Sequence, residues 1–175
     1  GLPASVLFRT VTRARELYQA GPCLRDSSRL RQVIDLPVAL DGFGPAERQA
    51  IDAFLARGKQ AGVDQGYIAR HRKAWWSVGL YRPAPILATY MARRPPGFVR
   101  NLDEARHINI AHGIYPREPL DDRVLDVLTE YLATRVSLSD GRTYAGGLTK
   151  FEPGEMERLP VPEPSSMLSL SLSLA

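Results

Sequence analysis

The spacing of apolar residues along the chain predicts two long helices. Apolar side chains recur on one helical face over residues 45–58, with Pro45 at the expected first position and Gly58 at the end. The same spacing runs over residues 119–134 and predicts the longest helix of the chain. Asp121 and Asp122 fall in the first turn of that helix, where carboxylates interact favourably with the helix dipole.

Short β-branched and aromatic runs between turn residues predict strands, and a shorter helix is expected over residues 13–19, capped by Thr12. A segment at 33–40 contains Pro37, which favours an edge position in a sheet. The strands are expected at residues 5–11, 75–80, 86–91, 98–101 and 108–114, with a glycine-rich loop at 141–147 and a short helix at 152–158. These elements predict an α+β fold: a small twisted, mostly antiparallel sheet packed with a few helices, one of them long and near residues 119–134.

Composition narrows the class of protein. The chain has 175 residues, of which 44% are hydrophobic and 24% charged, as in one soluble globular domain. A lone Cys23 excludes an internal disulfide and a cysteine-based zinc site. Arg9, Arg13 and Arg15 interrupt every early apolar run, so we expect no signal peptide and no membrane contact, and a cytoplasmic location. The serine- and leucine-rich tail, residues 163–175, is expected to be disordered or peripheral.

The formal net charge is +4, but the distribution of charge is more informative than its sum. No carboxylate occurs from Gln65 to Arg100. The same stretch contains seven cations: Arg70, Arg72, Lys73, Arg82, Arg93, Arg94 and Arg100. This segregation predicts a surface for an anionic partner such as the phosphates of DNA.

Two segments combine cations with aromatic residues. If Trp75 and Trp76 lie in a strand, they face opposite sides, so one is core and the other, taken here as Trp76, could stack on a base. In the glycine-rich stretch 141–150, Arg142, Tyr144 and Lys150 supply charge and stacking. The alternative for this stretch is a turn that closes the sheet with Tyr144 packed inward, and the sequence leaves both open.

The polar residues His107, Asn109 and His112 do not predict a metal site. In a strand the two histidines point to opposite faces, and no carboxylate is placed to join them. We expect Asn109 or His112 to bind backbone groups or a base edge instead.

Several segments occur in an order that identifies a family. They are Trp75-Trp76, residues 98–101, residues 109–116, the glycine-rich stretch running into Lys-Phe-Glu-Pro at 150–153, and Leu-Pro-Val-Pro at 159–162. This order resembles the C-terminal target-recognition region of TaqI-like N6-adenine DNA methyltransferases of restriction-modification systems. The resemblance covers about residues 67–162. It implies a target-recognition region at 61–162 and leaves residues 1–60 as a helix-and-strand subregion of uncertain role.

In that family an amino-terminal catalytic domain binds S-adenosylmethionine and holds the flipped adenine with an Asn-Pro-Pro-aromatic motif. Neither a cofactor-binding turn nor that motif occurs in this sequence, because the doublet Pro95-Pro96 is preceded by Arg94 and followed by Gly97. The resemblance therefore implies that S-adenosylmethionine belongs to the full-length protein, that this chain holds no cofactor, and that its partners are double-stranded DNA and an N-terminal methyltransferase domain. The candidate DNA contacts are Arg70, Arg72, Lys73, Trp76, Arg93, Arg94, Arg100, Asn109, Arg142, Tyr144 and Lys150.

Two other classes stay open at this point. A metal-dependent nuclease requires a cluster of Asp, Glu or His ligands, which the acid-free stretch does not offer. A protein-docking module with a basic surface requires an exposed aromatic patch and no salt-sensitive binding of nucleic acid.

Overall fold

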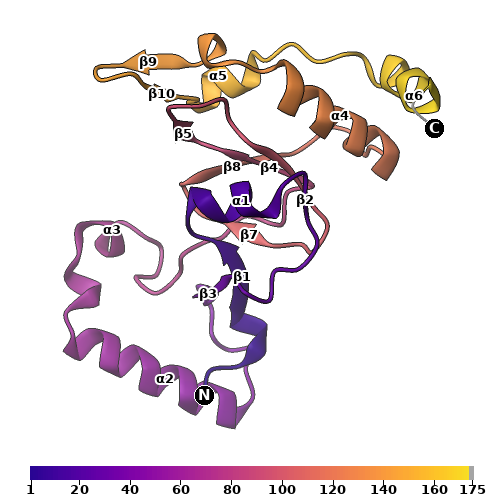
Figure 1. Cartoon of the computed structure of the whole chain (residues 1–175). Coiled ribbons are helices and arrows are strands. Elements are labelled where there is room, and N and C mark those ends of the chain that lie inside the picture. Colours follow the sequence, from indigo (N-terminus) through magenta and orange to yellow (C-terminus); the bar gives the residue numbers. More distant parts are fainter. Residues whose placement is uncertain (174–175) are drawn as a thin grey trace. The chain divides into compact units, whose positions relative to one another are not determined.

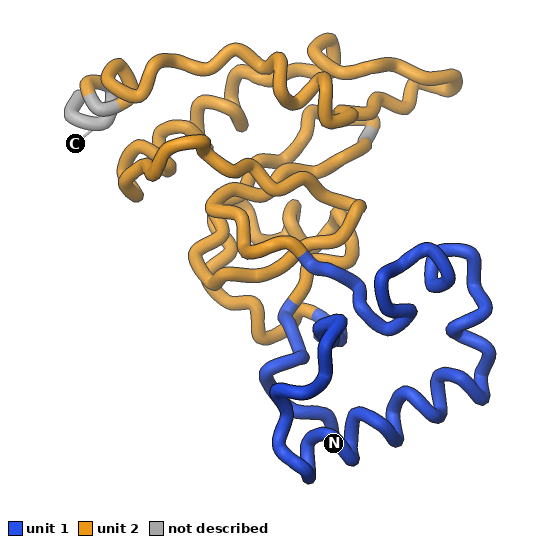
Figure 2. The backbone as a smooth tube through the Cα atoms, turned by 180° about the vertical axis from the view of Figure 1, so that it is seen from behind, with its two compact units in different colours: residues 1–9, 31–80 blue, residues 10–30, 81–175 orange. Residues whose placement is uncertain are grey.

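A computed structural model describes residues 1–173 (Figure 1). The chain divides into two compact units, each made of two segments (Figure 2). Unit 1 contains residues 1–9 and 31–80, and unit 2 contains residues 10–30 and those from Tyr81 onward. These units do not follow a boundary at residue 60, because unit 2 includes an early segment and unit 1 extends to Leu80. The assignment of residues 61–162 to target recognition stays a prediction about function.

Unit 1 is built around one amphipathic helix. Its elements are η1 (Ala4–Val6), the first part of β1 (Leu7–Val11), β3 (Arg31–Ile34), α2 (Pro45–Gln60), η2 (Val63–Gln65) and α3 (Tyr67–Arg70). Helix α2 buries Ile51 and Leu55 against Val6, Leu36 and Leu40, as its apolar spacing predicts. These residues form the core of the unit.

Helix α2 is longer than predicted. It has 16 residues and passes through Gly58 to Gln60, whereas α4 (Asp122–Arg135) has 14, so the prediction that the second helix is the longest is wrong. Gly58 lies within the helix and does not end it. Its lack of a side chain matters for packing, since a Cβ there would lie 2.7 Å from Cη2 of Trp75. The glycine leaves room for the indole.

The strand predicted at residues 75–80 does not form. The carboxylate of Asp35 instead accepts hydrogen bonds from the backbone N–H groups of Val78, Gly79 and Leu80, at 3.0, 2.8 and 2.8 Å. Gly79 has φ +70°, which favours glycine. The segment is therefore a turn held by a side chain distant in sequence.

Unit 2 contains a four-stranded sheet between two layers of helix. The strand order is β2-β6-β4-β8, where β2 is Cys23–Leu24, β6 is Phe98–Asn101, β4 is Ile86–Thr89 and β8 is Ala111–Ile114. Only β2 pairs in parallel, so this sheet is mostly antiparallel as predicted. Residues of β4 alternate between two cores: Ile86 and Ala88 pack with α4, and Leu87 packs with Leu17 of α1 (Ala14–Ala20).

The remaining strands form two smaller sheets. The end of β1 pairs in parallel with β7 (Arg106–His107), while β3 lies on the other side of β1. The sheet β5-β10-β9 is antiparallel and consists of Met91–Ala92, Leu148–Lys150 and Arg142–Tyr144. The α+β class is confirmed, although the strands form three sheets and not one.

Helix ends follow local capping rules. Asp121 accepts a hydrogen bond from the N–H of Val124 at 2.8 Å, which starts α4 three residues after Pro119. Helix α1 is capped at Arg13, not Thr12, because Glu16 accepts hydrogen bonds from both backbone N–H groups. The remaining short helices are η3 (Leu138–Asp140) and α5 (Pro153–Glu157).

The tail differs from the prediction of disorder. Residues Pro164–Ser173 form helix α6, and Met167 is buried in the core cluster that contains Leu128 and Leu132 of α4. A low-complexity sequence forms a helix here because α4 offers it an apolar surface. Residues 174–175 lie outside the described part of the chain. Within residues 1–173, no helix is both long and apolar enough to cross a bilayer.

Candidate nucleic-acid interface

The predicted glycine-rich loop forms a β-hairpin that brings three candidate residues to one face. Strand β9 pairs with β10 in a register that places Arg142 opposite Lys150 and Tyr144 opposite Leu148, with Gly146 and Gly147 at positive φ in the turn. The ammonium of Lys150 lies 4.7 Å from the centre of the Tyr144 ring, a cation–π contact. Tyr144 is 38% exposed, so it does not pack inward.

Arg142 is held in place by an acidic residue behind the hairpin. Its Nη2 lies 3.0 Å from Oε1 of Glu155, which is nearly buried. The charge of Glu155 raises the pKa of Arg142, so the guanidinium stays cationic. A fixed, fully charged guanidinium is suited to bidentate contact with a phosphate or a base edge.

The third strand of this sheet brings in two more cations. Strand β5 pairs with β10, Met91 opposite Lys150, and Arg93 and Arg94 follow β5 directly. Both arginines are exposed, and Cζ of Arg94 lies 3.3 Å from the centre of the Tyr18 ring. We call the set Arg93, Arg94, Arg142, Tyr144 and Lys150 the hairpin set.

Buried contacts anchor the hairpin to the rest of unit 2. The N–H of Phe151 donates to the carbonyl of Tyr90 at 2.9 Å, and Nε2 of His112 lies 2.6 Å from the carbonyl oxygen of Phe151. The hydroxyl of Tyr90 donates to Glu152, and this hydrogen bond is the largest cause of its raised pKa. The base of the hairpin is thereby fixed while its outer face stays exposed.

A second group of candidates lies in unit 1. Arg70, Arg72 and Lys73 are all exposed at and after the end of α3. Arg70 donates to Oε1 of Gln65 at 2.6 Å. In the described part of the chain, no carboxylate forms an ion pair with Arg72 or Lys73. We call Arg70, Arg72 and Lys73 the unit 1 set.

Trp76 is not available for stacking in the way its sequence position suggests. Both tryptophans are half-buried against the core of unit 1, because they lie in a turn and not in a strand. The rings of Trp75 and Trp76 meet edge to face at 5.8 Å, and the indole N–H of Trp76 donates to the carbonyl of Pro37 at 3.0 Å. The two residues stabilise unit 1.

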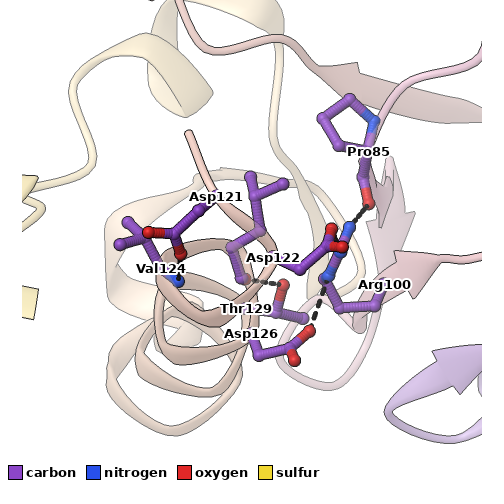
Figure 3. Close-up of polar contacts among 8 residues, drawn as sticks. Pro85, Arg100, Asp121, Asp122, Val124, Asp126 and Thr129 are labelled. Carbon is purple, nitrogen blue, oxygen red and sulfur yellow. Dashed lines mark hydrogen bonds and ion pairs between the residues drawn. The ribbon is translucent and has the colours of Figure 1, made fainter. Parts of the chain in front are cut away.

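Arg100 is a structural residue (Figure 3). Its side chain is 4% exposed, with Nη2 lying 2.9 Å from Asp122 and Nε lying 2.7 Å from Asp126 on α4. Its Nη1 donates to the carbonyl of Pro85 at 2.7 Å. The guanidinium therefore joins α4 to the central sheet and has no free face for a phosphate, so Arg100 does not enter the proposal below.

The polar residues His107, Asn109 and His112, in and between β7 and β8, form no metal site. Asn109 is exposed in the turn, while His107 is buried, and burial lowers the pKa of its imidazole. Nδ1 of His107 has no hydrogen-bond partner, so the ring acts as packing beside Gly113, where a Cβ would lie 2.6 Å from the ring. No group of three or more His, Cys, Asp or Glu that could hold a metal occurs among the residues described.

Sequence reasoning missed the residues that support these cations. Tyr18 lies under Arg94 but is on α1, far away along the chain, and Glu155 follows the hairpin on α5. Neither residue has a local signal, because each contact depends on how distant segments pack.

Comparison with known proteins identifies the family of this chain. Residues 36–173 match the family model described as the C-terminal domain of Type II methyltransferase M.Eco57I. The chain belongs to this family. The predicted resemblance is thereby confirmed at the level of the C-terminal region of a type II methyltransferase, and the matched range contains both the hairpin set and the unit 1 set.

Two similar proteins extend the comparison. Type II methyltransferase M.XamI of Xanthomonas campestris pv. amaranthicola is 57% identical over 162 residues, which are 93% of this chain and 31% of that protein. Type II methyltransferase M.AccI of Acinetobacter calcoaceticus is 25% identical over 113 residues, which are 62% of this chain and 21% of that protein. The chain thus spans less than a third of the length of either relative.

Proposed function

We propose that this chain is the DNA-binding target-recognition part of a site-specific N6-adenine DNA methyltransferase of a restriction-modification system. The observation that carries the proposal is the hairpin set: Arg142, Tyr144 and Lys150 share one face of a small sheet within the matched family region, and Arg93 and Arg94 directly follow a third strand of that sheet. Cations position the phosphates of a duplex, and side chains at strand ends and turns read base edges. Asn109, exposed in a turn of the same unit, is a further candidate contact.

The remaining parts of the proposal concern the whole protein. S-adenosylmethionine and the catalytic step belong to an N-terminal methyltransferase domain, which is the second partner of this chain, and the protein acts in the cytoplasm of a bacterium. The names of the relatives support a methyltransferase. The absence of a metal-ligand group among the described residues gives a metal-dependent nuclease no support.

Salt dependence of DNA binding tests the proposal. Each phosphate neutralised by a cation releases a counterion and adds roughly 0.9 to the slope of log affinity against log salt concentration for duplex DNA. We expect the chain to bind mixed-sequence duplexes at low salt, with a slope that falls when the hairpin set is changed by Arg93→Ala and Arg94→Ala. Arg135→Ala, an exposed arginine at the end of α4, is the matched control. No binding at low salt, or binding indifferent to salt, contradicts the proposal.

A further inference from the structure

Unit 1 carries an exposed apolar pair beside its basic residues. Tyr67 and Ile68 are the first residues of α3 and are 78% and 68% exposed. We propose that Tyr67 and Ile68 form a wedge that inserts between adjacent base pairs of the DNA, an inference that rests on the proposed function. Val63, 54% exposed one turn earlier, is a third exposed apolar side chain and is separated from the pair by Asp64, Gln65 and Gly66. We call residues 63–73 the wedge segment.

The wedge segment is held by its own hydrogen bonds. It follows Gly62 at φ +71°, and the N–H of Arg70 donates to the carbonyl of Gly66 at 3.0 Å. Nδ1 of His71 lies 2.6 Å from the carbonyl oxygen of Tyr67, and the two rings meet at 4.2 Å. The turn is thus ordered locally while its apolar side chains face solvent. A side chain already fixed in position loses little conformational freedom on insertion, which favours binding.

Charge favours DNA as the occupant over another protein. The apolar pair is followed within five residues by the unit 1 set, and no carboxylate occurs from Gln65 to Arg100. The wedge segment itself contains one carboxylate, Asp64, which accepts a hydrogen bond from the side chain of Gln65 at 2.8 Å. Proteins that kink DNA place apolar wedges beside Arg and Lys, whereas the cores of protein interfaces are depleted of lysine and charge. Arg70, Arg72 and Lys73 follow the apolar pair, so they are available to contact the phosphates beside the opened base step.

The energetic balance is consistent with insertion. Separating one base step costs unstacking free energy. Burial of the isoleucine side chain, which is exposed to water in the free chain, and stacking of the tyrosine ring on a base both contribute favourable free energy. Two such side chains therefore offset the cost of opening one step.

Unwinding of closed circular DNA tests the wedge without knowledge of the recognition sequence. Insertion between base pairs untwists the duplex, so a plasmid relaxed by a topoisomerase in the presence of saturating chain should retain an altered linking number after the protein is removed. We expect the double variant Tyr67→Ala, Ile68→Ala to bind the plasmid at low salt with affinity reduced about 5- to 100-fold. At saturation its unwinding per bound molecule should fall to less than a third of that of the unmodified chain.

Controls separate insertion from charge and from stability. The double variant Tyr81→Ala, Val38→Ala removes an equally exposed tyrosine and an exposed aliphatic residue outside the wedge segment, and should keep full unwinding. Arg72→Ala, Lys73→Ala should weaken binding yet keep unwinding per bound molecule. If the double variant Tyr67→Ala, Ile68→Ala has a lower melting temperature, the single variant Ile68→Glu replaces it in the test. This variant keeps the contact between the rings of Tyr67 and His71, and we expect it to abolish unwinding by itself.

The outcomes distinguish the two proposals. Binding by the unmodified chain without unwinding overturns the wedge and leaves the proposed function intact. Unwinding that survives in both wedge variants also overturns it, and assigns the apolar pair to contact with another protein. Absence of any salt-sensitive binding by the unmodified chain overturns the proposed function and the wedge with it.

Discussion

At the scale of single residues, arginines in similar sequence positions differ in exposure: Arg93 and Arg142 are exposed, whereas Arg100 is buried. Arg93 and Arg142 share a sequence context with Arg100, since all follow or lie in short strands. Only Arg100 lies opposite the first turns of α4, where Asp122 and Asp126 are one helical turn apart. The role of an arginine in this chain is therefore decided by which helix packs on its strand.

We predict that Arg100→Met lowers stability and leaves DNA binding unchanged. The substitution removes charge-assisted hydrogen bonds and should lower the free energy of unfolding by about 1 to 3 kcal/mol. The cost stays in this range because the carboxylates of Asp122 and Asp126 are 88% and 61% exposed and remain solvated. Chemical denaturation measures the first effect and low-salt binding of the folded variant measures the second. A variant that melts normally but loses DNA affinity contradicts the structural role.

We also predict that His107 makes the fold sensitive to mild acid. Burial lowers the pKa of His107 in the folded chain, so below its unfolded pKa of about 6.5 the unfolded chain binds a proton that the folded chain does not. Stability is therefore full above this pH and falls as the pH drops toward the folded pKa, by about 1.4 kcal/mol for each pH unit crossed. His107→Phe should reduce the loss in melting temperature between pH 7.5 and pH 5.5. An equal loss in His107→Phe contradicts the assignment.

At the scale of elements, the hairpin is the feature on which the proposed function depends most. We predict that Arg142→Ala or Tyr144→Ala reduces discrimination between preferred and unrelated duplexes by about 1 to 3 kcal/mol, if these side chains reach base edges. Because Tyr144 is 38% exposed, its loss should cost little stability. Preferred duplexes can be obtained by selection from random sequences, and Arg135→Ala is the control.

Melting curves must accompany these binding data. If Arg142→Ala keeps both its melting temperature and its full sequence preference, the hairpin only closes the sheet, and the residues that read bases lie elsewhere in the chain.

Elements with a strong local pattern could be predicted from the sequence, and elements fixed by distant contacts could not. The helix at 119–134 follows from its apolar periodicity, and the cap at Asp121 corrects only where that helix begins. The strand at 98–101 follows from a short β-branched and aromatic run after turn residues. The failed strand at 75–80 depends on Asp35, which lies 43 to 45 residues earlier and takes three of its backbone N–H groups. The candidate DNA contacts divide in the same way. Arg142, Tyr144 and Lys150 come together through one local hairpin, whereas Arg100 and Trp76 form hydrogen bonds with residues distant in sequence.

At the scale of the whole molecule, residues 61–162 do not contain a complete core. The segment 10–30 supplies Val11, Leu17, Leu24 and Leu30 to one of the two cores of unit 2. We predict that a fragment beginning at residue 61 does not unfold cooperatively. Each of these apolar side chains contributes about 1.5 to 3 kcal/mol, and together they match the 5 to 15 kcal/mol typical of a domain. Calorimetry of the fragment against the full chain measures this, and a sharp cooperative transition in the fragment contradicts it.

The division of each unit into two segments also sets an order of events during translation. Residues 10–30 leave the ribosome well before residues 98–101, so β2 forms only after β6 is synthesised, since Cys23 pairs with Arg100. Residues 31–80, which together with residues 1–9 make up unit 1, are synthesised in between, so unit 1 can fold first while Leu17 and Leu24 stay exposed to water. Nascent chains paused before residue 98 therefore present an uncovered apolar segment, which makes the early part of unit 2 the place where a chaperone is needed.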